Sequence, residues 1–145
     1  MNALLADPVV RLFTICAAVL VIKMLVTANL TGIYRTARKV YATPEDYRFF
    51  GQEPVTRSDE DIERIRRSHH NDLENIVPFL GIGFLYALTG PSYTMAAVLL
   101  IAFTAARVVY TVVYVAGLQP WRTITFAVAQ IALYVIAIAT LVGVL

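Results

Sequence analysis

The chain has 145 residues, of which 59% are hydrophobic and only 15% are charged, with a mean hydropathy of +0.68 and a formal net charge of +2. A soluble domain is normally about one quarter charged, so this composition excludes an ordinary soluble fold and predicts a helical membrane protein. The weak net charge gives no reason to expect nucleic acid. The single cysteine, Cys16, cannot form an internal disulfide and is expected to pack as a small apolar side chain.

The first apolar segment extends from about residue 9 to residue 34. It is long enough to cross a bilayer, which takes about 20 residues. No small-residue cleavage site precedes the next charge, so no cleavable signal peptide is predicted. Lys23 interrupts the segment, and a lysine at that depth costs about 2.5–3.5 kcal/mol on insertion scales. We therefore expect Lys23 to face a partner or a polar cavity, or to reach towards a membrane surface.

Residues 35–66 form the only extended polar region, and they hold most of the lysines and arginines of the chain. The distribution of Lys and Arg sets membrane topology, so this loop is predicted to be cytoplasmic. Thr43 followed by Pro44 is typical of a helix N-terminus and predicts a short helix within the loop.

A second helix start is predicted near Asp59. Ser58 and Asp61 have the spacing of a capping box, and the acidic residues between them suit a helix N-terminus. Two charge pairs with i,i+4 spacing support this helix, Glu60/Arg64 and Glu63/Arg67. No turn signal follows, so the helix is expected to continue directly into a membrane segment at residues 67–88.

Two further apolar segments cover residues 93–116 and 120–143. Tight turns are predicted at Gly90-Pro91 and at residues 117–120. The fold class is therefore all-α, an integral membrane four-helix bundle made of a single domain over residues 1–145.

The segment that joins loop and membrane carries a mixed polar face. Arg67, Asn71 and Glu74 are spaced i, i+4 and i+7, with His70 between them. Charged groups at the mouth of a membrane helix are candidates for a functional site, because they need partners. The alternative is a basic cluster that only sets topology.

A second set of polar residues lies in the later segments. Arg107, Tyr110 and Tyr114 are spaced i, i+3 and i+7, and the nearest membrane carboxylates for Arg107 are Asp72 and Glu74. A structural ion pair is the favoured interpretation for Arg107. Tyr114 could be an interface anchor, and Arg122 beside Trp121 could belong to an interfacial belt.

His69 and His70 near Asp72 and Glu74 suggest a metal site, but no second ligand-rich helix completes a coordination sphere, and none is predicted. Phosphate-loop and nucleophile-elbow motifs are missing from the sequence. The polar set instead suits a small zwitterionic, mostly anionic ligand. Arginines would hold its carboxylates and a glutamate would hold its ammonium group.

These residues resemble a known family. The stretch from Glu63 to Leu80 reads Glu-Arg-x-Arg-Arg-x-His-x-Asn-Asp-Leu-Glu-Asn-Ile-x-Pro-Phe-Leu. It closely resembles the signature of the membrane-associated proteins in eicosanoid and glutathione metabolism (MAPEG). Shorter matches support the resemblance along nearly the whole chain, at Tyr34-Arg35-x-x-Arg38-Lys39-Val40, Thr43-Pro44-Glu45-Asp46, Phe79-Leu80-Gly81-Ile82-Gly83 and Ala106-Arg107-Val108-Val109-Tyr110-Thr111.

The resemblance implies a homotrimer of four-helix bundles with a glutathione-binding region between neighbouring subunits, open to the cytoplasm. It implies glutathione contacts at Arg35, Arg66, Arg67, His69, Asn71, Glu74 and Tyr114. Arg122 matches the arginine near the glutathione sulfur, and Asp46 matches its acidic partner. Supporting roles are implied for Asp72, Arg107, Tyr110 and Thr123.

Within the family, the chain is most similar to the microsomal glutathione transferase branch. The isomerase branch carries Arg-Ser followed by Tyr, whereas here Arg122-Thr123 is followed by Phe126. It also carries arginine where this chain has His70, whose role stays open.

The expected function is therefore conjugation of glutathione, the co-substrate, to lipophilic electrophiles within the membrane. Glutathione peroxidase activity on lipid hydroperoxides is a second activity to test. The alternatives are a glutathione-dependent prostaglandin-type isomerase and a non-enzymatic membrane scaffold. The Ala/Val/Leu-rich helices and the lack of a retention signal favour a bacterial inner membrane over the endoplasmic reticulum.

Overall fold

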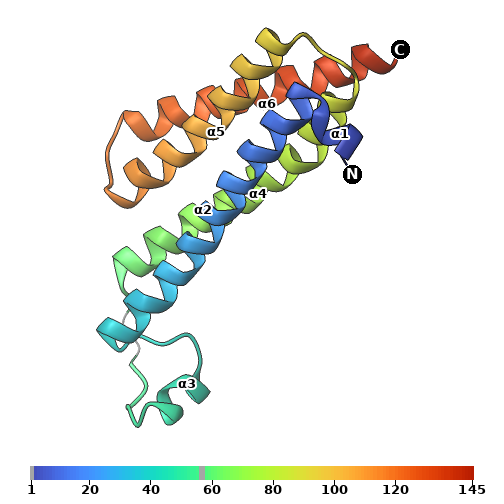
Figure 1. The fold of residues 1–145 in the computed structure, drawn as a ribbon. Coiled ribbons are helices and arrows are strands. Elements are labelled where there is room, and N and C mark those ends of the chain that lie inside the picture. The colour runs from blue at the N-terminus through green and yellow to red at the C-terminus, as the bar shows by residue number, and fades with distance from the viewer. Residues whose placement is uncertain (1, 56–57) are drawn as a thin grey trace.

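The computed structural model describes residues 2–55 and 58–145, and within them every regular element is a helix. The four long helices α2, α4, α5 and α6 form a bundle, and α3 lies beyond one end of it, opposite the end that holds both chain termini (Figure 1). The all-α prediction is confirmed for these residues. The elements are α1 (Asn2–Ala6), α2 (Pro8–Arg38), α3 (Pro44–Phe49), α4 (Glu60–Leu88), α5 (Tyr93–Val115) and α6 (Trp121–Val144).

The first long helix, α2, extends four residues beyond the predicted apolar segment. Asp7 caps its start by accepting hydrogen bonds from the backbone of Val9 and Val10. The helix ends at Arg38, where Lys39 adopts a left-handed conformation with φ 54°. The extra turn forms because arginine is a good helix former and its charge suits a helix C-terminus. The apolar segment and the helix therefore end at different residues.

The start of α4 differs from the prediction in one detail. Asp59, and not Ser58, is the N-cap, and its carboxylate accepts hydrogen bonds from the backbone N–H of Asp61 and Ile62 at 3.1 and 3.2 Å. The predicted capping box is therefore wrong by one residue. The short helix α3 begins as predicted, with the Thr43 hydroxyl accepting from Asp46 N at 3.4 Å.

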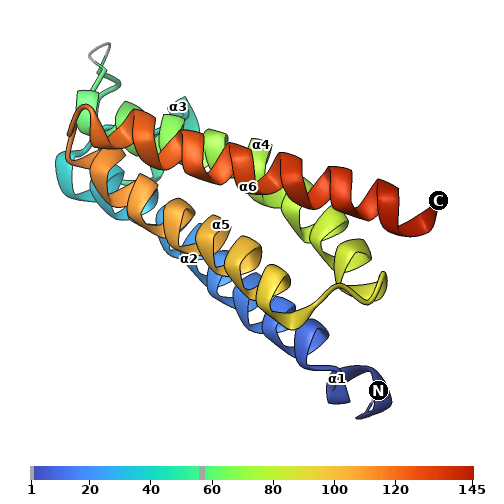
Figure 2. The same cartoon turned by 90° about the horizontal axis from the view of Figure 1, so that it is seen from above.

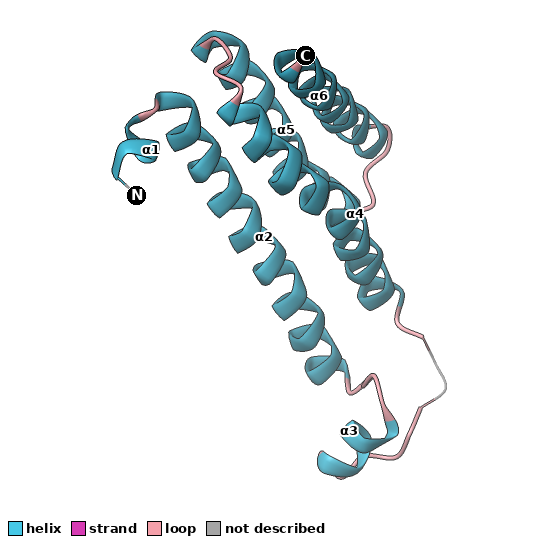
Figure 3. Ribbon diagram, turned by 90° about the vertical axis from the view of Figure 1, so that its right-hand side faces the viewer, coloured by secondary structure: helices cyan, strands magenta, loops and turns pink. Residues whose placement is uncertain are grey.

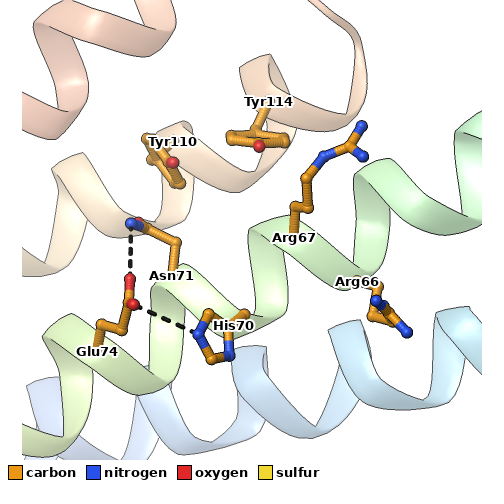
Figure 4. Close-up of a pocket in the computed structure, with 7 residues that line it drawn as sticks. All are labelled: Arg66, Arg67, His70, Asn71, Glu74, Tyr110 and Tyr114. Carbon is orange, nitrogen blue, oxygen red and sulfur yellow. Dashed lines mark hydrogen bonds and ion pairs between the residues drawn. The ribbon is translucent and has the colours of Figure 1, made fainter.

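Only one of the two predicted charge pairs forms on α4. Arg64 and Glu60 pair at 2.9 Å, as predicted. Glu63 pairs with Arg66 at 3.3 Å and not with Arg67. Arg67 extends towards α5 (Figure 4), so Glu63 pairs with its i,i+3 neighbour Arg66 instead.

In the bundle, α4 and α5 are the central helices. Each contacts all three other long helices, whereas α2 and α6 do not contact one another in the described part of the chain (Figures 2 and 3). The core includes Phe79 of α4, stacked on Phe103 of α5 with ring centroids 4.1 Å apart. Phe13 of α2 fits against Gly83, where an added Cβ would meet its ring at 3.0 Å. The central position of α4 brings its polar half between the other helices.

Three of the helices, α2, α5 and α6, are long and apolar enough to cross a membrane. Their outward faces expose large apolar side chains such as Val98 and Ile131, as lipid contact requires. These are the features of an integral membrane protein. The first half of α4 is too charged to share this property, although α4 has 29 residues and packs along the same bundle.

Candidate functional site

A buried cluster of charges joins three helices in the middle of the bundle. Asp72 of α4 accepts hydrogen bonds from Lys23 of α2 and from Arg107 of α5. The side chains of Asp72 and Arg107 are both fully buried. Asp72 is therefore confirmed as the partner of Arg107, and Glu74 is not its partner. The same carboxylate provides the partner that Lys23 needs.

This cluster is connected to a more open polar region. Arg107 Nη1 donates to Asn71 Oδ1 at 3.0 Å, and Asn71 Nδ2 lies 3.5 Å from Glu74 Oε2. The Arg107 guanidinium also lies over the ring of Tyr110, 4.4 Å from its centroid. Arg107 of the buried cluster thus contacts both Asn71 and Tyr110 and holds their side chains in place.

In front of Asn71 and Tyr110 lies a cavity of about 580 Å³. Figure 4 shows the side chains from α4 on one side and the two tyrosines from α5 on the other. The predicted residues of the mixed polar face therefore come together, and the tyrosines join them. The lining consists of Arg66, Arg67, His70, Asn71, Glu74, Tyr110 and Tyr114.

The charges around this cavity are not paired off as they are in the buried cluster. Arg67 extends towards the α5 tyrosines and has no ion-pair partner in the described part of the chain (Figure 4). Glu74 has only a 3.4 Å contact with His70 and the weak contact with Asn71. Its side chain remains 56% exposed. A cation and an anion are thus both available to a ligand.

Arg122 borders the same cavity through Tyr114. Its guanidinium lies over the Tyr114 ring, 5.0 Å from the centroid. With the amide of Gln119 turned so that its oxygen faces Arg122, that oxygen accepts from Arg122 Nε at 3.1 Å and from Nη2 at 2.7 Å. In that orientation the Gln119 amide nitrogen donates to the hydroxyl of Thr123. Gln119 and Tyr114 therefore orient the guanidinium from two sides.

Two predicted glutathione contacts, Arg35 and His69, and the predicted partner of Arg122, Asp46, are not among the residues that line this cavity in the single chain. Arg35 is on α2, Asp46 is on α3, and His69 is on α4 next to the lining residue His70. Arg35 Nε and His69 Nδ1 are buried without a hydrogen-bond partner among the described residues. No ion pair or hydrogen bond joins Asp46 to Arg122 in residues 2–55 and 58–145.

One residue of the site was not predicted. Gln119 contacts Arg122, and their i,i+3 spacing was visible in the sequence. This spacing did not predict the contact, because α6 begins after Pro120 and Gln119 therefore lies outside the helix, where helical spacing does not apply. In the described residues, no group of three or more His, Cys, Asp and Glu side chains comes together to hold a metal ion.

The fold and the site define a helical membrane protein with a cationic, tyrosine-walled cavity at one end of its bundle. Comparison with known proteins is more specific. The MAPEG family model matches residues 13–142, and the chain belongs to the MAPEG family.

Relatives of two kinds share about two fifths of their residues with it. Microsomal glutathione S-transferase 1 of Homo sapiens is 42% identical over 127 residues, covering 84% of this chain and 82% of the relative. Prostaglandin E synthase of Macaca fascicularis is 41% identical over 128 residues, covering 88% of this chain and 84% of the relative. The rat transferase is 41% identical over 133 residues, 88% and 86% of the two chains.

Proposed function

We propose that this chain is a membrane-bound glutathione transferase that joins the glutathione thiolate to lipophilic electrophiles. The observation that carries the proposal is the cavity lined by Arg67, Glu74 and Tyr114, with the Arg122 guanidinium over the Tyr114 ring. Relatives named as glutathione S-transferases, together with the family match, support it.

In this proposal, the charged and polar groups that line the cavity hold the tripeptide. Glutathione has two carboxylates and one ammonium group. Arginine binds carboxylates in a bidentate manner, so Arg67 and Arg66 suit the carboxylates, and Glu74 suits the ammonium group. Asn71 is already held by Arg107 and contributes its amide without reorganisation.

Arg122 has the chemical role in the proposal. A free thiol has a pKa of about 8.5, and only the thiolate is a good nucleophile. A guanidinium beside the sulfur favours the charged form. The thiolate electron pair then forms the C–S bond, and the leaving group departs with the electron pair of the bond that breaks. The lipophilic substrate would enter laterally from the bilayer.

Residues outside the cavity of the single chain need a neighbouring subunit in this proposal. The family resemblance implies a homotrimer in which Arg35, His69 and Asp46 act at a cavity shared between copies. The unpartnered nitrogens of Arg35 and His69 are compatible with such a shared site. Asp46 would then reach the Arg122 of a neighbouring copy.

The isomerase alternative has a specific argument against it. Relatives named prostaglandin E synthase are as similar as the transferases, so overall identity does not separate the two activities. Phe126 stands where the isomerase branch has a tyrosine, and its ring lies 6.2 Å from that of Tyr110. Compared with the isomerase branch, this chain therefore lacks one tyrosine hydroxyl near the cavity. An endoperoxide substrate tests the isomerase activity, and a lipid hydroperoxide tests the peroxidase activity.

We further propose that α4 crosses the membrane as the fourth helix and that residues 35–66 face the cytoplasm. The position of α4 between the three apolar helices supports the crossing. A bacterial inner membrane remains our expectation from composition. The relatives compared are mammalian and lend it no support.

The decisive experiment is conjugation of glutathione to a chloronitrobenzene by the purified protein in detergent. We expect glutathione-dependent product and an ultraviolet absorbance of the thiolate on adding glutathione. Arg122→Ala is expected to abolish most of that absorbance while glutathione still binds. Arg11→Ala, which removes an exposed arginine near the opposite end of α2, is the matched control. No conjugation and no glutathione binding by calorimetry would favour the scaffold alternative.

A further inference from the structure

A pair of amide side chains lies in the bundle below the cavity. Asn75 of α4 is 3% exposed, and its Oδ1 accepts a hydrogen bond from Gln130 Nε2 of α6. Asn75 Nδ2 donates to the backbone carbonyl of Asn71 at 2.7 Å. The pair thus begins one turn below Asn71 on α4 and ends two turns beyond Arg122 on α6.

This bond is unusual among the contacts of α6. The other hydrogen bonds of side chains within α6 stay inside α6 or reach the turn before it, as for Thr125 with Trp121 and Thr140 with Ile136. In the described part of the chain, the Gln130–Asn75 bond is the only side-chain hydrogen bond that joins α6 to another helix. Apart from the Arg122 guanidinium over the Tyr114 ring, the buried side chains that α6 gives to the core of the bundle are apolar, as at Ala129, Ala132 and Ile136.

Apolar contacts set the position of a membrane helix weakly. Lipid tails are as apolar as the side chains they would replace, so burying leucine or isoleucine between helices gives little net gain. A polar bond between two helices is directional and has one register, because an amide donor must meet an acceptor. One such bond can therefore fix how far α6 is shifted and rotated relative to α4.

We infer that the Gln130–Asn75 pair positions α6 so that Arg122 faces the ligand held by α4. This inference rests on the proposed function, because it concerns the same cavity. Neither residue lines the cavity, so both are positioning residues and not catalytic ones. Their effect is transmitted along α6 to Arg122, whereas Arg67, Asn71 and Glu74 keep their places on α4.

The test is Gln130→Leu, which keeps the volume of the side chain and removes its donor. We expect glutathione to bind with nearly unchanged affinity. The thiolate absorbance at saturating glutathione and kcat should both fall between about threefold and twentyfold, the range of single interhelical hydrogen bonds in membranes. Asn75→Leu combined with Gln130→Leu should lower the thiolate yield little further than Asn75→Leu alone.

Thr140→Val is the matched control, because it removes a buried hydroxyl of α6 that bonds only within its own helix. It should leave the thiolate yield unchanged. A second measurement needs no glutathione: the distance distribution between nitroxide labels on Arg66→Cys and Ile124→Cys, in a Cys16→Ala background diluted with unlabelled protein. Both label sites are exposed. Gln130→Leu should broaden or shift this distribution, and Thr140→Val should not.

Three results would overturn the inference. The first is an unchanged label distance in Gln130→Leu, whatever the enzyme does with glutathione. The second is a shifted distance with an unchanged thiolate yield, which would make the pair structural only. The third is a raised KM for the electrophile alone, which would place Gln130 at the second substrate. If the wild-type protein forms no thiolate but the label distance responds to Gln130→Leu, the proposed function fails and α6 positioning by the pair stands.

Discussion

The two polar regions of α4 lie side by side but differ in how their charges are satisfied. Asp72 is fully buried and bonds to Lys23 and Arg107, so its charges are paired within the chain. Glu74, two residues later, is 56% exposed and contacts only His70 and Asn71 weakly. Because Asp72 and Glu74 lie within one turn of the same helix, the difference comes from the direction of each side chain and not from its position along α4.

The difference separates charges that hold the protein together from charges that are free to hold a ligand. A buried ion pair costs desolvation that its partners must offset, so it persists only when its geometry is satisfied by the fold. An exposed, weakly paired charge contributes little to stability. Such a charge keeps its hydrogen-bonding capacity for a ligand.

The largest expected effect is the loss of stability on removing Asp72. Asp72→Ala leaves Lys23 and Arg107 as buried cations without a counter-charge, which should cost about 3–5 kcal/mol. Glu74→Ala removes the same group from the exposed region and should change stability by less than about 0.5 kcal/mol. Thermal unfolding of both variants in the same detergent checks this. Equal losses in the two variants would contradict the comparison.

For ligand binding, we expect the larger effect at Glu74 and not at Asp72. Glu74→Gln should weaken glutathione binding by about tenfold, since a charge-assisted hydrogen bond to the ammonium group is lost. The melting temperature should stay near that of the wild type. Calorimetric titration with glutathione measures the affinity. An unchanged affinity would remove Glu74 from the role of ammonium anchor.

A smaller effect is expected at Gln119, which orients the Arg122 guanidinium. Gln119→Leu should lower the thiolate yield by about threefold, because an exposed hydrogen bond is worth only about 0.5–1 kcal/mol net. Affinity for glutathione should not change. Gln52→Leu, in the loop after α3, is the control, because its amide contacts only the backbone of Phe50. An identical loss in both variants would show that Gln119 has no particular link to Arg122.

The smallest effect concerns the cap of α4. Arg38 donates to the carboxylates of Asp59 and Asp61 at 2.7 Å, and its hydrogen bond holds the pKa of Asp59 below its usual value. A carboxylate whose pKa is lower in the folded than in the unfolded protein stabilises the fold at pH values above its unfolded pKa, about 3.9. This stabilisation is lost as the pH falls through the folded pKa. Arg38→Ala should therefore lower the melting temperature barely measurably at pH 5–7, since the pair is exposed.

The same variant should show no difference from the wild type once Asp59 is protonated, well below pH 4. Melting curves over this pH range provide the check. A melting-temperature difference between Arg38→Ala and the wild type that grew on acidification would contradict this prediction, because a carboxylate with a lowered pKa stabilises the fold less at low pH.

The sequence by itself determined where the long helices of this protein lie and which polar face of α4 lines the cavity. The apolar segments and the Thr43-Pro44 start signal are local, and α3 begins with Pro44 after the Thr43 cap, as they indicate. The helical spacing of Arg67, Asn71 and Glu74 also placed them on one face correctly, because the 3.6-residue period depends on one helix alone.

Only the tertiary structure decided which groups meet across helices. Asp72 and Glu74 were equally plausible partners for Arg107, and the rotation of α4 against α5 selected Asp72. The partner of Lys23, the contact of Gln119 with Arg122, and the Gln130–Asn75 bond likewise join parts of the chain whose relative orientation no spacing rule gives. The physical reason is that a helical period fixes directions around one axis, whereas rotation and shift between axes depend on the packing of all four helices together.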